Sequence, residues 1–253
     1  MTDHLHTALA GIRSLAAYIS VSLYVLLLAP PGIVLAVIFK WPEVLYWLAR
    51  GGVRLGLATV GITFHATGLE HVQRHRAAVY CVNHASNIEP PILFMVLKAL
   101  HPKLVVLYKA ELRKALPVLK RAWDVVGFVP IERGSRERSM QAIETAAAAL
   151  RGGKSFLIFP EGTRSRTGKL LPFRKGGFIM AIKGGATIVP VAIQGTSAAM
   201  RKGSPIIRPV VVSVRLGLPI KVTGRTLEER DTLISITRAA VQGLLEAGSI
   251  EAD

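Results

Sequence analysis

A long stretch without charged side chains near the start of the chain restricts how this protein can fold. The run SLAAYISVSLYVLLLAPPGIVLAVIF extends from Ser14 to Phe39, between Arg13 and Lys40. About 20 apolar residues in a helix cross the hydrocarbon core of a bilayer, so this run is long enough to span one. A buried core helix and a cleaved signal peptide are the alternatives, and the absence of a small-x-small cleavage site argues against the second. We therefore expect a membrane-attached protein.

The sequence Pro30-Pro31-Gly32 lies inside this run and leaves its geometry open. Proline lacks a backbone N–H and clashes with the preceding helical turn. Two shorter helices joined by a bend, dipping into one leaflet, are therefore as plausible as one straight span. The next stretch, Val44 to Phe64, carries Arg50 and Arg54 four positions apart on one helical face. This pattern predicts an amphipathic helix at the membrane surface.

The rest of the chain alternates strand-like and helix-like patterns. Short apolar runs bounded by Gly, Pro or Asn predict buried strands. These runs are Ala77–Val82, Leu104–Tyr108, Val125–Ile131, Ser155–Phe159, Ile188–Ile193 and Val210–Leu216. Helical segments separate them, among them Arg136–Arg151 with Ser135 as N-cap. We predict the α/β class, with a central, largely parallel sheet flanked by helices. Residues 1–65 form an N-terminal hydrophobic helix or two-helix membrane motif in this prediction, and residues 66–253 form the α/β domain.

The composition narrows the possible partners. The chain has a net charge of +16, a pI of about 10.6 and a mean hydropathy of +0.41. Such a balance favours anionic partners: lipid headgroups, phosphorylated substrates, acidic carrier proteins or nucleic acid. We expect no nucleic-acid partner, because zinc-finger, basic-zipper and RNA-binding aromatic signatures are absent from the sequence. Cys81 is the single cysteine, which excludes an intrachain disulfide. Its apolar context predicts core packing rather than a nucleophile.

The first segment with chemical meaning is Asn83-His84-Ala85-Ser86-Asn87-Ile88-Glu89, which follows a predicted strand. Five positions on a regular helix separate two side chains by about 140°. His84 and Glu89 therefore meet only if a turn intervenes, and Asn83 to Asn87 favours one. A carboxylate bonded to one imidazole nitrogen leaves the other nitrogen to take a proton. We predict His84 as a general base and Glu89 as its orienting partner. The alternative role for Glu89 is to stabilise a helix N-terminus.

The second segment, FPEGTRS from Phe159 to Ser165, also follows a predicted strand. It supplies a glycine turn, a carboxylate and an arginine, whose planar fork suits a phosphate. Ligand sites in parallel sheets gather at the carboxyl ends of strands, so we expect the two segments to share one cleft. A P-loop, a serine-hydrolase elbow and metal-ligand spacing are absent from the sequence. We therefore expect no metal.

Four ordered blocks resemble the glycerolipid acyltransferase family, whose best-known members are the 1-acylglycerol-3-phosphate acyltransferases. The blocks are Asn-His-x4-Glu, GFVPIER at Gly127–Arg133, FPEGTRS, and Val189-Pro190-Val191. Glu89 departs from the family pattern, which has Asp at that position. The resemblance implies that His84 removes the proton of an acceptor hydroxyl, which attacks the thioester carbonyl of an acyl donor. That donor is acyl-CoA or acyl-carrier protein, with no further cofactor.

The resemblance also implies roles for other residues. Glu161, Gly162, Thr163 and Arg164 match the block linked to acceptor binding, and Arg133 is a candidate second phosphate contact. Further candidates at the substrate site are Asn83, Ser86, Lys175 and Gly176.

The implied reaction converts lysophosphatidic acid to phosphatidic acid in phospholipid biosynthesis. Membrane lipids and the lysophospholipid are then the partners, with acyl-carrier protein as a possible third. We expect a bacterial inner membrane as the location, with the site at the cytoplasmic face. Three alternatives stay open: an acceptor such as glycerol 3-phosphate or another lysophospholipid, a membrane thioesterase or esterase using His84 on water, and a noncatalytic lipid-binding protein.

Overall fold

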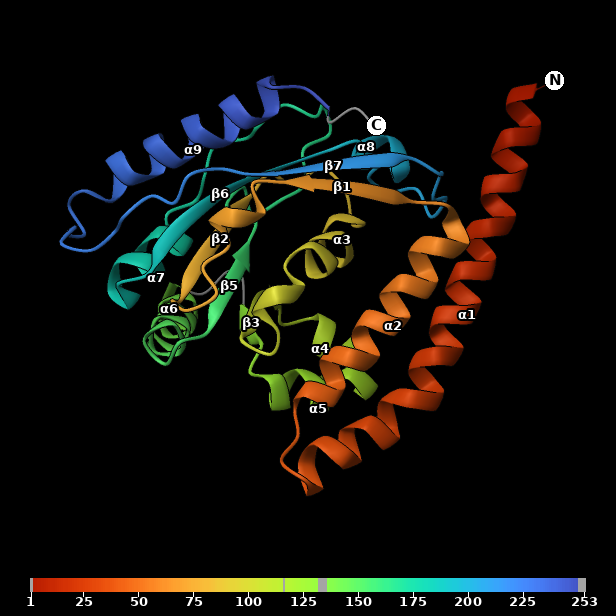
Figure 1. Cartoon of the computed structure of the whole chain (residues 1–253), viewed down its shortest axis with the longest axis horizontal. Helices are drawn as coiled ribbons and strands as arrows, with labels where there is room; N and C mark the ends of the chain where they lie inside the picture. Colours follow the sequence, from red (N-terminus) through yellow and green to blue (C-terminus); the bar gives the residue numbers. More distant parts are fainter. Residues whose placement is uncertain (1, 116, 132–135, 250–253) are drawn as a thin grey trace.

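A mostly parallel sheet forms the centre of the molecule. The computed structural model describes residues 2–115, 117–131 and 136–249. Its seven strands lie in the order β1-β7-β6-β2-β5-β3-β4. They are β1 Thr63–Thr67, β2 Ala78–Val82, β3 Leu104–Lys109, β4 Val129–Ile131, β5 Ser155–Ile158, β6 Thr187–Gln194 and β7 Val211–Leu216. Among the strands of the described residues, only β6 and β7 pair antiparallel. The predicted α/β class with a largely parallel sheet is confirmed (Figure 1).

Helices cover both faces of this sheet. One face packs against α6 (Arg136–Arg151), α7 (Gly176–Gly184) and α9 (Arg230–Glu246), and the other against α2 (Glu43–Val60) and α3 (Glu89–Val96). In β2, Tyr80 contributes to the core beside α3 while Cys81 contributes to the core beside α7. A strand covered on both faces needs apolar residues at every position, which explains the continuous run in the sequence. The shorter helices are η1 Leu69–His71, η2 Lys98–Leu100, α4 Leu112–Ala115, α5 Pro117–Val126 and α8 Thr196–Ala199.

The N-terminal segment folds as a helical hairpin. Helix α1 (Thr2–Ile38) is continuous through Pro30 and Pro31, and α2 begins at Glu43 after a short turn. The bend that we considered at Pro30-Pro31-Gly32 therefore does not end the helix. Figure 1 shows α1 changing direction in its second half, as prolines inside a helix produce a kink when neighbouring packing holds the flanking turns.

Small residues let the two helices of the hairpin approach closely. A Cβ at Gly32 would meet the side chain of Leu48, and one at Gly52 would lie 3.1 Å from the Tyr24 ring. The Tyr24 hydroxyl donates to the Leu48 carbonyl at 3.0 Å. Close backbone approach through glycine is a common way for helices to associate in membranes.

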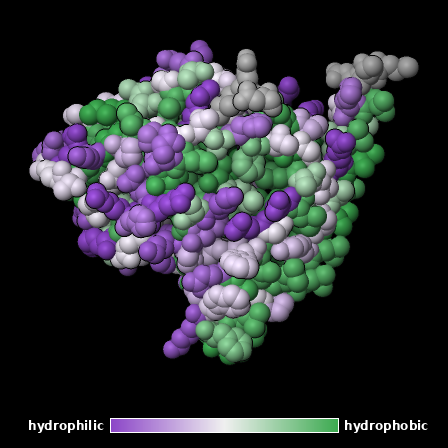
Figure 2. Space-filling view, viewed as in Figure 1, coloured by the Kyte–Doolittle hydropathy of each residue, from purple (hydrophilic) through white to green (hydrophobic). Residues whose placement is uncertain are grey.

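The outer side of α1 is apolar and exposed. Residues 4–38 have the length and composition of a helix that crosses a membrane, and 11% of their most apolar window is buried. Leu23, Leu27 and Ile38 are 53%, 69% and 66% exposed. Figure 2 shows this apolar surface along the edge of the molecule formed by α1.

The fold differs from the predictions at two strands. The strand expected at Val125–Ile131 is shorter, because Val125 and Val126 end α5 and Gly127 turns the chain with φ 80°. The strand β1 was not predicted. It extends across the expected boundary at residue 65, so residues 63–65 belong to the sheet. Helix α6 has the predicted bounds, and its expected N-cap Ser135 lies outside the described residues.

Candidate active site

The two polar segments leave the same edge of the sheet. Strand β2 ends at Val82, directly before Asn83 and His84, and the parallel neighbour β5 ends at Ile158, directly before Phe159. Helix α8 follows β6, the neighbour on the other side of β2. The carboxyl ends of three adjacent parallel strands thus supply the site, as in other parallel sheets.

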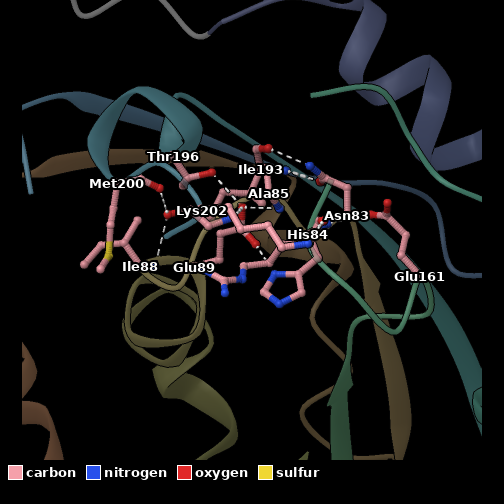
Figure 3. Close-up of polar contacts among 12 residues, drawn as sticks. Asn83, His84, Ala85, Ile88, Glu89, Glu161, Ile193, Thr196, Met200 and Lys202 are labelled. Carbon is pink, nitrogen blue, oxygen red and sulfur yellow. Dashed lines mark hydrogen bonds and ion pairs between the residues drawn. The ribbon is translucent and has the colours of Figure 1, made fainter. Parts of the chain in front are cut away.

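Glu89 and His84 lie in direct contact. The Glu89 Oε2 atom is 2.6 Å from His84 Nδ1, and the Glu89 side chain is fully buried. The Oε1 atom accepts hydrogen bonds from the N–H groups of Ala85 and Ser86, both at 2.9 Å, and from the Thr196 hydroxyl at 2.7 Å (Figure 3). These donors stabilise an ionised carboxylate. A carboxylate partner fixes the proton on Nδ1 and leaves Nε2 free to accept one.

Glu89 also occupies the first position of α3, with Pro90 and Pro91 in its first turn. A carboxylate stabilises a helix N-terminus, and proline suits that turn because its missing N–H is not needed there. The position of Glu89 is therefore compatible with both roles that we considered, and its catalytic role stays a prediction. The turn predicted at Asn83–Asn87 lets the imidazole reach this carboxylate.

The imidazole of His84 is held on several sides. Its ring stacks on Phe159, with centroids 4.1 Å apart and planes inclined by 25°. The backbone N–H of His84 donates to Glu161 Oε1 at 2.6 Å, and its carbonyl accepts from Ser165 N–H at 2.7 Å. The His84 side chain remains 17% exposed. FPEGTRS thus fixes the backbone and one ring face of His84 while the ring stays accessible.

The Glu161 side chain links the two polar segments through a hydrogen bond to the His84 backbone. Its Oε1 atom accepts from His84 N–H and its Oε2 atom accepts from Leu171 N–H at 2.9 Å. Burial raises the pKa of this carboxyl, and the two backbone N–H groups oppose that shift. Both oxygens are engaged by backbone donors, so the geometry gives Glu161 a positioning role, and the acceptor contact implied by the resemblance stays a prediction. Gly162 follows with φ 68°, where a Cβ would lie 2.6 Å from Arg174 Nε.

Asn83 and Ser86 hold the backbone of neighbouring segments. Asn83 exchanges two hydrogen bonds with the backbone of Ile193 in β6, at 2.9 and 2.8 Å. The Ser86 hydroxyl donates to the Met200 carbonyl at 2.8 Å and is fully buried. Both side chains therefore fasten the His84 turn to the chain around β6 and α8.

The basic candidates lie in different surroundings. Arg164 is partly exposed at the FPEGTRS turn, and Thr163 beside it is exposed. Lys175 lies 3.5 Å from Asp231 of α9, with both side chains mostly exposed, and Gly176 begins α7. Arg133 lies outside the described residues. The sequence reasoning missed Thr196 and Lys202, whose ammonium lies at the FPEGTRS turn.

Two other features bear on the chemistry of this region. Burial raises the pKa of the Cys81 thiol, which packs in the core as expected. Within the described residues, no three His, Cys, Asp or Glu side chains gather as metal ligands would. Next to the site, Pro90 and Pro91 line an apolar cavity of about 360 Å³, which also has Tyr24, Tyr46 and Trp123 in its walls.

Comparison with known proteins assigns the chain to a family. The family model described as Acyltransferase matches residues 63–194, from β1 to the end of β6. The chain belongs to the glycerolipid acyltransferase family. It is an acyltransferase enzyme, and the matched residues contain both polar segments of the site.

Named members of the glycerolipid acyltransferase family support this assignment. The chain is 30% identical over 212 residues to a 1-acyl-sn-glycerol-3-phosphate acyltransferase of Limnanthes douglasii, covering 81% of this chain and 73% of the relative. A Borreliella burgdorferi protein of the same name is 28% identical, with coverage of 79% and 78%.

A solved structure has the same fold. It is the crystal structure of the 1-acyl-sn-glycerophosphate (LPA) acyltransferase PlsC from Thermotoga maritima, with a TM-score of 0.80 and 22% identity. The match covers 95% of this chain and 97% of that one, so the similarity includes the N-terminal hairpin.

Proposed function

We propose that this acyltransferase moves a fatty acyl group from a thioester donor to the free hydroxyl of 1-acylglycerol-3-phosphate, which gives phosphatidic acid. Relatives that carry this activity in their names support the choice of acceptor. The donor is acyl-CoA or acyl-carrier protein, both of which are anionic and suit a chain with a net charge of +16.

The observation that carries this proposal is the buried carboxylate of Glu89 against His84. Four donors converge on Glu89: Nδ1–H of His84, the N–H groups of Ala85 and Ser86, and the Thr196 hydroxyl. A carboxylate so held stabilises the imidazolium that forms when Nε2 takes a proton. This arrangement suits His84 to act as a general base. The reaction then needs no nucleophile from the protein, because the acceptor hydroxyl is the nucleophile.

The reaction then follows as one acyl transfer. Nε2 of His84 accepts the hydroxyl proton while the acceptor oxygen forms a bond to the thioester carbonyl carbon. The carbon–sulfur bond breaks as the tetrahedral intermediate collapses, and the imidazolium returns its proton to the leaving thiolate. General-base catalysis of this kind contributes about 10²–10⁴-fold. Alignment of the two substrates supplies much of the rest.

Charged and apolar groups around His84 suit the two ends of a lysolipid. The Arg164 guanidinium donates two parallel hydrogen bonds to a phosphate in this proposal, and Arg133 is a further candidate. Pro90 and Pro91, directly after Glu89, are among the residues that line the apolar cavity, so this cavity is suited to an acyl chain.

We further propose that α1 and α2 attach the enzyme to a membrane, with the chain from β1 onward forming the acyltransferase domain. The exposed apolar side of α1 supports this role. A strongly basic protein is attracted to the anionic cytoplasmic leaflet. This supports a bacterial inner membrane as the location, with the site at its cytoplasmic face.

The test uses the purified full chain in detergent or lipid, supplied with lysophosphatidic acid and long-chain acyl-CoA. Free thiol and phosphatidic acid are followed together in the unaltered chain and in His84→Ala. We expect equal amounts of the two products, and a fall of about 10²–10⁴-fold in the variant. Arg138→Ala, which changes a basic residue of α6, serves as the control and should retain activity.

Other outcomes would redirect the proposal. Thiol release that continues without an acceptor, with free fatty acid as the product, would establish a thioesterase instead. Activity with glycerol 3-phosphate or another lysophospholipid, and none with lysophosphatidic acid, would change the acceptor. If acyl-CoA gives no product, the same assay with acyl-carrier protein tests the other donor.

A further inference from the structure

The segment that follows α8 connects the active site to the membrane helix. Residues 200–209 run from the end of α8 towards β7 and contain Arg201, Lys202 and Arg208. None of these three residues lies in the four family blocks described above. The Met200 carbonyl accepts the Ser86 hydroxyl at 2.8 Å, so one end of the segment is fixed two residues from His84.

Lys202 reaches from this segment to the FPEGTRS turn. Its Nζ atom lies 3.1 Å from the Arg164 carbonyl and 3.4 Å from the Thr163 hydroxyl (Figure 3 includes Lys202 in the site). An ammonium has three N–H donors, and these contacts use two of them. Within the described part of the chain, Lys202 forms no ion pair. These contacts therefore hold the Lys202 ammonium next to the backbone of Arg164. They leave its third N–H free to donate to a ligand.

The other end of the segment is fastened to α1. The Ser14 hydroxyl accepts from Ile207 N–H at 2.8 Å, and the Tyr18 hydroxyl donates to the Pro205 carbonyl at 2.8 Å. Ser14 is buried, at 3% exposure. These two side chains restrict the segment close to Lys202, so the membrane helix contributes to the position of its ammonium.

We propose that Lys202 binds the phosphate of the acceptor together with Arg164, and that Ser14 and Tyr18 position the segment that carries it. This inference rests on the proposed function, because it assumes an acceptor with a phosphate at the FPEGTRS turn. A guanidinium donates two parallel hydrogen bonds to a phosphate, and an ammonium beside it adds the attraction of a compact positive charge. A phosphate-free acceptor gains nothing from the ammonium.

The test compares Lys202→Met with Lys202→Arg and the control Arg201→Met in the full chain. Arg201→Met removes the same charge from the adjacent exposed residue. We expect Lys202→Met to raise the KM for lysophosphatidic acid about tenfold or more, with kcat within about threefold of the unaltered enzyme. Lys202→Arg should restore much of the KM, and Arg201→Met should change it little.

A second acceptor separates phosphate binding from a merely structural role. With 1-acylglycerol, which has the same hydroxyl and no phosphate, Lys202→Met should leave kcat/KM unchanged. Ser14→Ala and Tyr18→Phe should raise the KM for lysophosphatidic acid by less than Lys202→Met. They should add little to that variant, because they act through the same ammonium.

Several results would overturn the inference. It fails if Lys202→Met leaves the KM unchanged, if Arg201→Met raises it equally, or if both acceptors lose activity in parallel. If the unaltered chain does not acylate lysophosphatidic acid, the proposed function fails instead. Direct binding of lysophosphatidic acid and of 1-acylglycerol to the unaltered chain and Lys202→Met then decides the role of Lys202. Equal preference for the phosphorylated lipid in both proteins would refute it.

Discussion

At the scale of single residues, the site is built around the longer side chain of Glu89, which stands where the family pattern has Asp. Glu89 lies at the first position of α3, and its Oε2 atom contacts His84 Nδ1 at 2.6 Å. The Oε1 atom meets two backbone N–H groups and a hydroxyl from α8 at the same time. A carboxylate with one methylene fewer would need the turn or the ring to move to satisfy all of these donors.

Exchange of this carboxylate for an amide tests the proposed base. In Glu89→Gln the amide oxygen can accept from Ala85, Ser86 and Thr196 only if its NH2 group faces Nδ1. That arrangement forces the proton onto Nε2 and removes the base. We expect kcat to fall by about 10²–10⁴-fold, with melting temperature measured alongside. Glu70→Gln alters a side chain that is 73% exposed and should leave kcat unchanged. A Glu89→Gln enzyme of full activity would contradict the proposed pair.

The sequence predicted part of this site for a physical reason. His84 and Glu89 are five positions apart and a local turn brings them together, so their pairing was predictable. Thr196 bonds to Glu89 across 107 positions, and Glu161 bonds to the His84 backbone across 77. Those contacts depend on which strands are neighbours, and a pattern of apolar residues does not specify strand order. The positioning role of Glu161 therefore needed the structure.

At the scale of elements, strands buried on both faces were predictable and an edge strand was not. The central strand β2 is apolar at every position, whereas β1 has the sequence TFHAT and alternates exposed with partly buried residues. The helix α1 shows the converse case. Pro30 and Pro31 predict a break, yet packing along α2 keeps the helix continuous. Tertiary contacts outweigh local propensity at both places.

The end of β1 makes a close approach that only glycine permits. Gly68 has φ 74°, and a Cβ there would overlap the Leu216 carbonyl of β7. We expect Gly68→Ala to lower the free energy of unfolding by about 1–3 kcal/mol or more. The control is Gly153→Ala, which has φ 84° and nothing within 4 Å of the added Cβ. The control variant adds backbone strain but no steric overlap. Thermal unfolding should therefore show a larger loss of stability for Gly68→Ala than for Gly153→Ala. Equal losses would mean that the overlap relaxes freely.

The histidine packed between α2 and α3 should make the stability of the fold depend on pH. The His101 ring packs between Tyr46 and Phe94, with centroids 4.9 and 4.2 Å away. Burial, assisted by the nearby Arg50 charge, lowers the pKa of His101 from its usual 6.5 to about 4. The unfolded chain therefore binds a proton more readily than the folded one between these values. Stability should fall as pH drops from 6.5 towards 4, and not change through this group above 6.5.

Replacement of this histidine provides the measurement. His101→Phe retains an aromatic ring and removes the titrating group, so its melting temperature should fall less between pH 6.5 and 4 than that of the unaltered chain. His75→Gln changes an exposed histidine and should keep the original dependence. Parallel curves for all three proteins would exclude His101 as the source.

At the scale of the whole molecule, an apolar edge and a basic composition act together. The exposed side of α1 offers an apolar surface, and a net charge of +16 would favour anionic headgroups in the proposed membrane attachment. The sequence predicted the apolar run and the charge. It left open whether the run forms one span or two shorter helices joined by a bend, because Pro30 and Pro31 lie inside it.

Charges placed on this edge should detach the protein from lipid. Leu23 and Leu27 are 53% and 69% exposed on α1. Each lysine placed at the centre of a membrane helix costs about 2.5–3.5 kcal/mol of insertion free energy. We expect Leu23→Lys with Leu27→Lys to float with liposomes far less than the unaltered chain. Leu218→Lys alters a leucine that is 74% exposed beyond β7 and should float normally. Equal flotation of the double variant would show that α1 does not enter the bilayer.

The pairing of β1 with β7 has a consequence for how the chain is made. Thr63 lies opposite Val211, so the first strand to leave the ribosome waits for the last one. At synthesis rates of ~5–20 residues per second, that wait is roughly 7–30 s. The α1–α2 hairpin precedes β1 and is complete throughout this interval. If α1 attaches the chain to a membrane as proposed, the bilayer would receive the hairpin before the sheet closes, and the acyltransferase domain would finish folding while already tethered.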